Sequence, residues 1–65
     1  MAWYNLGLEG GGTVKGKKWS KAECFQKALD LDPKDADAWY NLGLEGGGTV
    51  KGETWSLAEC FQNAH

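Results

Sequence analysis

Apolar and small residues recur along the chain at helical spacing. They occupy the i, i+3, i+4 and i+7 positions at Trp39, Leu42, Gly43 and Gly46. This spacing is typical of one face of an amphipathic helix. Three consecutive glycines then end the pattern, because a glycine just past the last turn adopts the left-handed conformation at little cost. We therefore predict a helix over residues 36–45 and an equivalent helix over residues 2–9.

A second kind of helical segment begins with a capping signal. Residues 20–23 read S-K-A-E and residues 56–59 read S-L-A-E. A serine three residues before a glutamate is typical of a capping box, in which each side chain bonds the backbone N–H of the other residue. Pro33 ends the first of these segments, because the residue before a proline is driven out of helical geometry. We predict helices over residues 21–31 and 57–64.

The two kinds of segment alternate because the chain repeats itself with a period of 36 residues. Over the 27 aligned pairs from Ala2/Ala38 to Ala28/Ala64, only four pairs differ, and each difference removes a lysine from the second copy. The differing pairs are Lys17/Glu53, Lys18/Thr54, Lys21/Leu57 and Lys27/Asn63. We interpret residues 1–65 as a single domain, with repeat one over 2–37 and a truncated repeat two over 38–65. Identity this high favours a designed protein or a recently duplicated array.

Each repeat is expected to form a pair of antiparallel helices. We interpret the glycine-rich stretch that begins at Gly46 as a long irregular turn between the two helices, with Val14 or Val50 placed against the core. A helix pair cannot bury its apolar face alone, so neighbouring pairs must stack. The predicted fold class is all-α: two tandem helix-turn-helix repeats in an α-solenoid fragment, with Phe25 and Trp39 in the central core.

Charge and hydropathy exclude several kinds of partner. Seven lysines against nine acidic residues leave a net charge of -2. Nucleic acids and anionic membranes attract basic surfaces, so neither is expected to be the main partner. No apolar run approaches the roughly 18 residues of a membrane-spanning helix, and no signal peptide is visible.

The two cysteines, Cys24 and Cys60, hold equivalent positions in the two repeats. Neighbouring helices pack about 8–10 Å apart, whereas a disulfide requires Cα atoms within about 7 Å. We therefore predict two buried, reduced thiols, which favours a cytoplasmic location. Because the only histidine is His65, we expect no metal site, and no nucleophile–base pair or cofactor site is recognisable.

One stretch comes close to a phosphate-binding motif. Residues 11–18 nearly satisfy G-x-x-x-x-G-K-[ST], but Lys18 stands where the Mg²⁺-binding hydroxyl belongs. The second copy has Thr54 at that position, but Glu53 replaces the motif lysine. The motif also requires a preceding strand, whereas a helix is predicted there. Nucleotide binding is therefore the weakest of the functional hypotheses.

The junction between the two repeats resembles the tetratricopeptide repeat (TPR). Residues 28–43 read A-L-D-L-D-P-K-D-A-D-A-W-Y-N-L-G. Residues 38–43 resemble the opening of the first helix of that family, and Gly16 resembles its turn glycine. The second-helix positions are matched by Phe25, Ala28, Leu29, Leu31, Asp32 and Pro33. The glycine-rich stretch followed by K-A-x-x-F-x-K-A at 21–28 is also similar to the Sel1-like branch of the superfamily.

The resemblance implies a non-catalytic scaffold that binds proteins or peptides. In that family, one flank of the first helix lines a groove for extended peptides. The corresponding residues here are Tyr4, Leu8, Asp37, Tyr40 and Leu44. Packing between repeats is an equally weighted explanation for the tyrosines and leucines. The basic carboxylate clamp of some family members is not expected, because Tyr40 and Leu44 occupy its positions. The four tryptophans have core explanations in preference to ligand stacking.

A self-assembling structural unit with no separate ligand is the alternative function. The surface at the start of the first repeat and the surface at the end of the second are the same two surfaces that meet between the repeats. They are therefore complementary, and one molecule could pack on the next in a head-to-tail contact. The residues expected at this contact are Trp3, Leu57 and Phe61.

Overall fold

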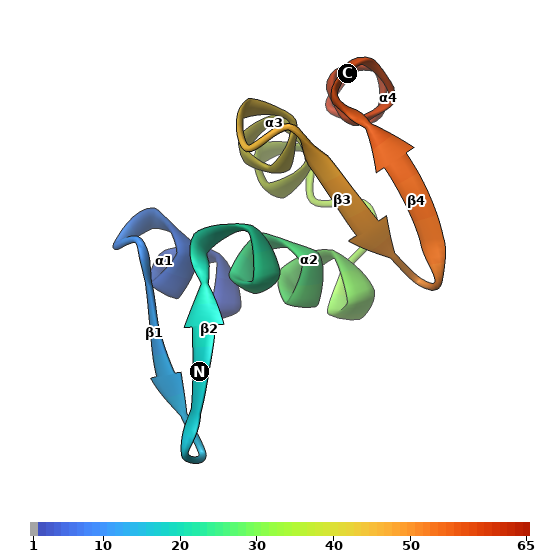
Figure 1. Ribbon diagram of the computed structural model, residues 1–65. Helices are drawn as coiled ribbons and strands as arrows, with labels where there is room; N and C mark the ends of the chain where they lie inside the picture. Colours follow the sequence, from blue (N-terminus) through green and yellow to red (C-terminus); the bar gives the residue numbers. More distant parts are fainter. Residues whose placement is uncertain (1) are drawn as a thin grey trace.

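The computed structural model describes residues 2–65 as two consecutive units, each made of a helix, a β-hairpin and a second helix (Figure 1). The first unit contains α1 (Trp3–Leu8), β1 (Gly11–Val14), β2 (Lys17–Ser20) and α2 (Lys21–Leu31). The second contains α3 (Ala36–Leu44), β3 (Gly47–Val50), β4 (Glu53–Ser56) and α4 (Leu57–Asn63). The molecule is elongated, with principal dimensions of 33 × 18 × 18 Å.

Three of the four helices, α2, α3 and α4, begin at a side-chain cap. The Ser20 hydroxyl accepts a hydrogen bond from the Glu23 amide at 3.1 Å, and the Glu23 carboxylate accepts one from the Ser20 amide at 2.8 Å. An equivalent capping box begins α4. Asp35 caps α3 by accepting a hydrogen bond from the Ala38 amide at 3.2 Å. All four predicted helices are confirmed to within one residue at either end.

The prediction of an all-α fold was wrong. The glycine-rich stretches between the helices of each unit are antiparallel β-hairpins and not irregular turns. In the first hairpin Gly11 lies opposite Ser20 and Val14 lies opposite Lys17. The second hairpin has the same register. The backbone N–H and C=O groups of these stretches are therefore used in strand ladders.

Two pairs of residues with positive φ explain these hairpins. Lys15 and Gly16 have φ values of 51° and 77°, and Lys51 and Gly52 have values of 52° and 80°. Positive φ at both central residues of a two-residue loop matches the type I′ turn, whose twist suits two antiparallel strands. The sequence T-V-K-G carried this signal. The prediction missed it because the preceding glycines were assigned only to ending a helix.

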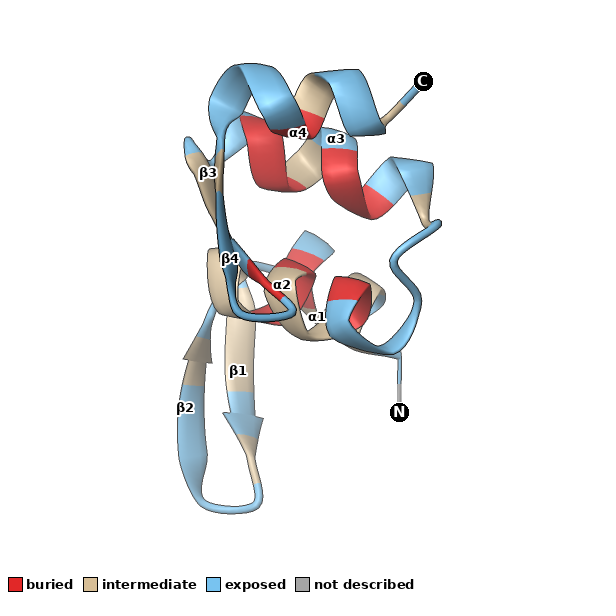
Figure 2. Ribbon diagram, turned by 90° about the vertical axis from the view of Figure 1, so that its right-hand side faces the viewer, coloured by how far each residue is buried: buried red, intermediate tan, exposed pale blue. Residues whose placement is uncertain are grey.

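The core lies between the two units. Phe25 is fully buried and Trp39 is almost so, which confirms their predicted central position. Leu29, Leu42 and the second-hairpin residue Val50 complete the largest part of this core. In Figure 2 the buried residues gather on the helices and on β3, whereas the first hairpin extends away from the helices and carries no buried residue.

Candidate interaction surface

The junction between the units is formed by α2 of the first unit and by α3 and β3 of the second. The apolar side chains of the core fill it. Three polar contacts accompany this packing: Asn41 Nδ2 to the Tyr4 hydroxyl at 3.2 Å, the Lys51 amide to Asp30 Oδ1 at 2.8 Å, and Lys21 Nζ to Glu45 Oε2 at 3.6 Å. The first two contacts join residues 37 and 21 positions apart in the sequence. No local pattern in the sequence marks the pairing of Asp30 with Lys51, so neither residue was predicted.

Two of the predicted partner-binding residues, one in each unit, are exposed to solvent. Leu8 at the end of α1 is 51% exposed, and Leu44 at the equivalent position of α3 is 56% exposed. The second unit covers α2 of the first unit, and the first unit covers α3 of the second. The leucine is nevertheless exposed to a similar extent in both units. Packing between the units therefore does not use this position, and each unit presents the equivalent leucine to solvent.

The equivalent tyrosines Tyr4 and Tyr40 differ in burial and in hydrogen bonding. Tyr4 is half-buried, its ring lies 5.8 Å from that of Phe25, and its hydroxyl accepts the hydrogen bond from Asn41. Tyr40 keeps the ring contact, with Phe61 at 5.6 Å, but its side chain is 52% exposed. The structure thus places Tyr4 at the junction between the units and leaves Tyr40 at an uncovered surface.

The remaining predicted residue of this surface, Asp37, lies exposed in the first turn of α3. It precedes Leu44 by seven residues, so the two lie on the same side of the helix. Asn41 lies between them and donates its side-chain N–H to the Asp37 carbonyl at 2.8 Å. The residue equivalent to Asp37 in the first unit is Met1, which is outside the described residues.

The three residues predicted for end-to-end association lie on different elements. Trp3 on α1 packs edge-on against Trp19, with ring centroids 4.7 Å apart. Phe61 on α4 is half-buried beside Tyr40. Leu57 at the start of α4 is 46% exposed and takes the place of Lys21. Trp3 and Phe61 therefore pack against aromatic rings of their own units, whereas Leu57 remains largely exposed to solvent.

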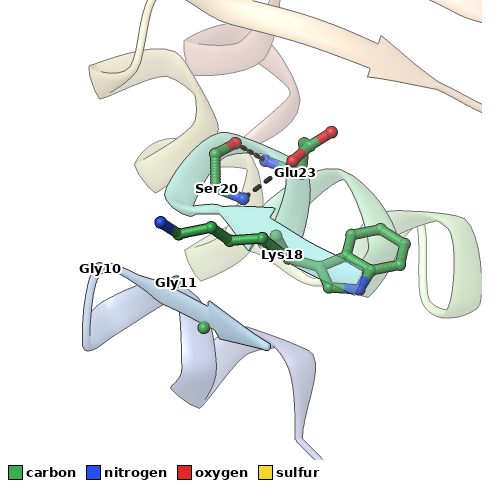
Figure 3. Close-up of a pocket in the computed structure, with 7 residues that line it drawn as sticks. Gly10, Gly11, Lys18, Ser20 and Glu23 are labelled. Atoms are coloured by element: carbon green, nitrogen blue, oxygen red, sulfur yellow. Dashed lines mark hydrogen bonds between the residues drawn. The ribbon is translucent and has the colours of Figure 1, made fainter. Parts of the chain in front are cut away.

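A pocket of about 440 Å³ lies where the phosphate-binding motif was considered (Figure 3). It lies between the Gly10–Gly12 segment and the residues Lys18–Ser20, with Glu23 at its edge. Ser20 and Glu23 hydrogen-bond to each other, and this bond lowers the pKa of the Glu23 carboxyl. The glycine stretch is itself a strand followed by a type I′ turn, and β2 intervenes before the next helix. This geometry differs from a loop that wraps a phosphate at a helix N-terminus.

Cys24 and Cys60 are free thiols with no solvent exposure. Burial raises the pKa of both thiols, and the negative charges of the neighbouring Glu23 and Glu59 raise it further. The thiolate is the nucleophilic and metal-binding form of cysteine. The environment of both residues therefore favours the unreactive, protonated form.

Residues 2–65 contain no group of three or more histidine, cysteine or acidic side chains placed to hold a metal ion. None of the helices in the described part of the chain has the length and apolar character needed to cross a bilayer.

Part of the sequence matches a known protein family. Residues 16–44 match the family model of the TPR repeat. The match runs from the turn of the first hairpin through α2 to the end of α3. It therefore includes both helices that meet at the junction between the units. No curated protein and no solved structure matches the chain. The segment from Gly16 to Leu44, which is less than half of the chain, is thus similar to the TPR repeat.

Proposed function

We propose that the chain is a non-catalytic helical-repeat scaffold that binds an extended segment of another protein along the first helix of each unit. The TPR-like character of residues 16–44 supports this role, because such repeats generally mediate contacts between proteins. The observation that carries the proposal is that Leu8 and Leu44 are exposed to solvent to a similar extent. An apolar side chain that recurs once per unit, and that packing between units does not use, suits a partner that runs across both units.

The chemistry of this surface indicates what the partner would present. Leu8 and Leu44 suit apolar side chains on the bound segment. Asp37, on the same side of α3 as Leu44, and the net charge of -2 favour a segment with basic flanking residues. The buried, protonated thiols of Cys24 and Cys60 suit a reducing compartment such as the cytoplasm.

A selection from a random peptide library displayed on phage tests this function. We expect peptides selected on the unmodified chain to bind more than about tenfold more weakly to Leu8→Glu and Leu44→Glu variants, because a charge would replace an apolar contact. Leu31→Glu is the matched control: Leu31 is 68% exposed, but lies at the end of α2 and not on the first helix of either unit.

Two outcomes would contradict the proposed function. In the first, no peptide is enriched above the background of an unrelated helical protein. In the second, the selected peptides lose affinity equally for Leu31→Glu and for Leu44→Glu. The second outcome would show that any exposed leucine attracts the peptides, without a specific surface.

A further inference from the structure

The junction between the units has a counterpart on each outer face of residues 2–65, and no element of these residues covers either counterpart. One side of the junction is the face of α2 with Phe25, Gln26 and Ala28, next to Tyr4 of α1. The corresponding residues around α4 are Phe61, Gln62 and Ala64, next to Tyr40 of α3. The opposite side of the junction carries Ala38, Asn41, Leu42, Val50 and Lys51, and the corresponding residues around α1 are Ala2, Asn5, Leu6, Val14 and Lys15. Every residue in each set is identical to its counterpart.

The burial of these counterparts shows what the junction covers. Ala38 and Leu42 have no solvent exposure, whereas Ala2 is exposed and Leu6 is only half-buried. Phe25 is likewise fully buried, whereas Phe61 is not. Ala2 is the extended residue before α1, whereas Ala38 lies within α3. For the pairs Leu6/Leu42 and Phe25/Phe61, however, the residues and the local helical structure are the same. The difference therefore comes from the neighbouring unit that covers one copy and not the other.

The two helices within each unit pack against each other in the same way in both units. An added Cβ at Gly7 would lie 2.7 Å from the Phe25 ring, and one at Gly43 would lie 2.7 Å from the Phe61 ring. The helices of each unit therefore approach each other equally closely, whether or not the unit is covered. A second copy would meet a preformed surface, so little conformational ordering would oppose binding.

We propose that the α4 face of one molecule binds the α1–β1 face of a second copy of this chain, in the register in which α2 packs on α3 and β3. In this register Ala2 of the second copy is buried as Ala38 is. The Tyr40 hydroxyl accepts a hydrogen bond from Asn5 of the second copy, as Tyr4 does from Asn41. The first hairpin of the second copy lies along α4 as β3 lies along α2.

Two contacts of the internal junction are not reproduced, so the association is weaker than the internal packing. Leu57 faces Glu9 of the second copy where Lys21 faces Glu45. Leu29, which is fully buried in the core, corresponds to the exposed and polar His65. Because the two faces differ from each other, the contact is heterologous and adds molecules in a line or closes them into a ring.

Sedimentation velocity of the 65-residue chain over about a hundredfold range of concentration tests this proposal, because self-association follows mass action. We expect the average mass to rise continuously with concentration and to pass that of a dimer. Ala2→Glu should weaken the association by more than about tenfold, because it buries an unpaired carboxylate in the contact. Its own unit should still fold, since Ala2 is exposed there, and the helical circular dichroism signal checks this.

Two further variants separate this proposal from the peptide-binding function. Leu8→Glu should leave the association unchanged, because the equivalent Leu44 stays exposed at the internal junction. Leu57→Lys should strengthen the association and make it sensitive to salt, because it restores a cation opposite Glu9. A chain that stays monomeric at every concentration would overturn the proposal, as would an Ala2→Glu variant that associates like the unmodified chain. Neither result would affect peptide binding through Leu8 and Leu44.

Discussion

The side-chain amide of Asn41 donates a hydrogen bond to the hydroxyl of Tyr4 at 3.2 Å, across 37 positions of sequence. This bond fastens α3 of the second unit to α1 of the first. The same Asn41 amide group also donates to the Asp37 carbonyl at 2.8 Å within its own helix. Asn41 therefore connects a local helical contact with the packing between the units.

Removing the Tyr4 hydroxyl should destabilise the junction. We expect Tyr4→Phe to lower the free energy of unfolding by about 1 kcal/mol, the usual net contribution of one hydrogen bond. This loss corresponds to a fall of several degrees in the melting temperature. Tyr40→Phe is the matched control, because the Tyr40 hydroxyl makes no hydrogen bond within residues 2–65. Equal melting temperatures for the two variants, measured by circular dichroism at low concentration, would contradict this role of Asn41.

The two equivalent helix glycines should tolerate a methyl group to different extents. An added Cβ at Gly7 meets the Phe25 ring, which is fully buried and has no free space into which to move. At Gly43 it meets the Phe61 ring, which is partly exposed. Overpacking costs about 1–3 kcal/mol, and the better helix propensity of alanine returns at most about 1 kcal/mol.

We therefore expect Gly7→Ala to destabilise the chain clearly and Gly43→Ala to destabilise it less. Urea unfolding followed by tryptophan fluorescence measures the difference. A Gly43→Ala variant that is the less stable of the two would show that the surroundings of Phe61 are as rigid as those of Phe25.

The turn of the first hairpin should gain stability from a residue suited to positive φ. Lys15 adopts a φ of 51°, a conformation that costs most residues about 1–2 kcal/mol and that asparagine adopts more readily. Lys15→Asn creates the Asn-Gly pair preferred in type I′ turns, so the melting temperature should rise. Lys18→Asn, on β2 where φ is not positive, should produce no such rise. A lower melting temperature for Lys15→Asn would indicate a different turn.

Acid should weaken the cap of α2. The hydrogen bond from the Ser20 amide lowers the pKa of the Glu23 carboxyl in the folded chain. A carboxyl whose pKa is lower in the folded state stabilises that state above its unfolded pKa, and this contribution is lost as the pH falls through the folded pKa. Glu23→Gln can still accept the hydrogen bond but does not titrate.

We therefore expect the stability of Glu23→Gln to fall less steeply than that of the unmodified chain at pH values below the normal pKa of glutamate. Melting temperatures measured across this acidic range provide the comparison. Curves of the same slope for both proteins would mean that Glu23 ionisation does not contribute to the cap.

The ends of the helices could be predicted from the sequence because the interactions that set them are local. Ser20 and Glu23 are three residues apart, and the same capping box forms at Ser56 and Glu59 in the second unit. The hairpins could also have been recognised locally, from the Lys15–Gly16 turn. They were missed because a glycine that ends a helix and a glycine that begins a strand look alike in a single sequence.

The period of 36 residues by itself determined that the chain contains two nearly identical units. It could not determine which copy of each residue is buried, because Phe25 and Phe61 have the same close neighbours in sequence. Tertiary packing made that decision: α3 and β3 cover α2, while no element of residues 2–65 covers the outer face of α4. Tyr4 therefore bonds to Asn41 while Tyr40 faces solvent, since burial depends on what lies across a surface as well as on the residues that form it.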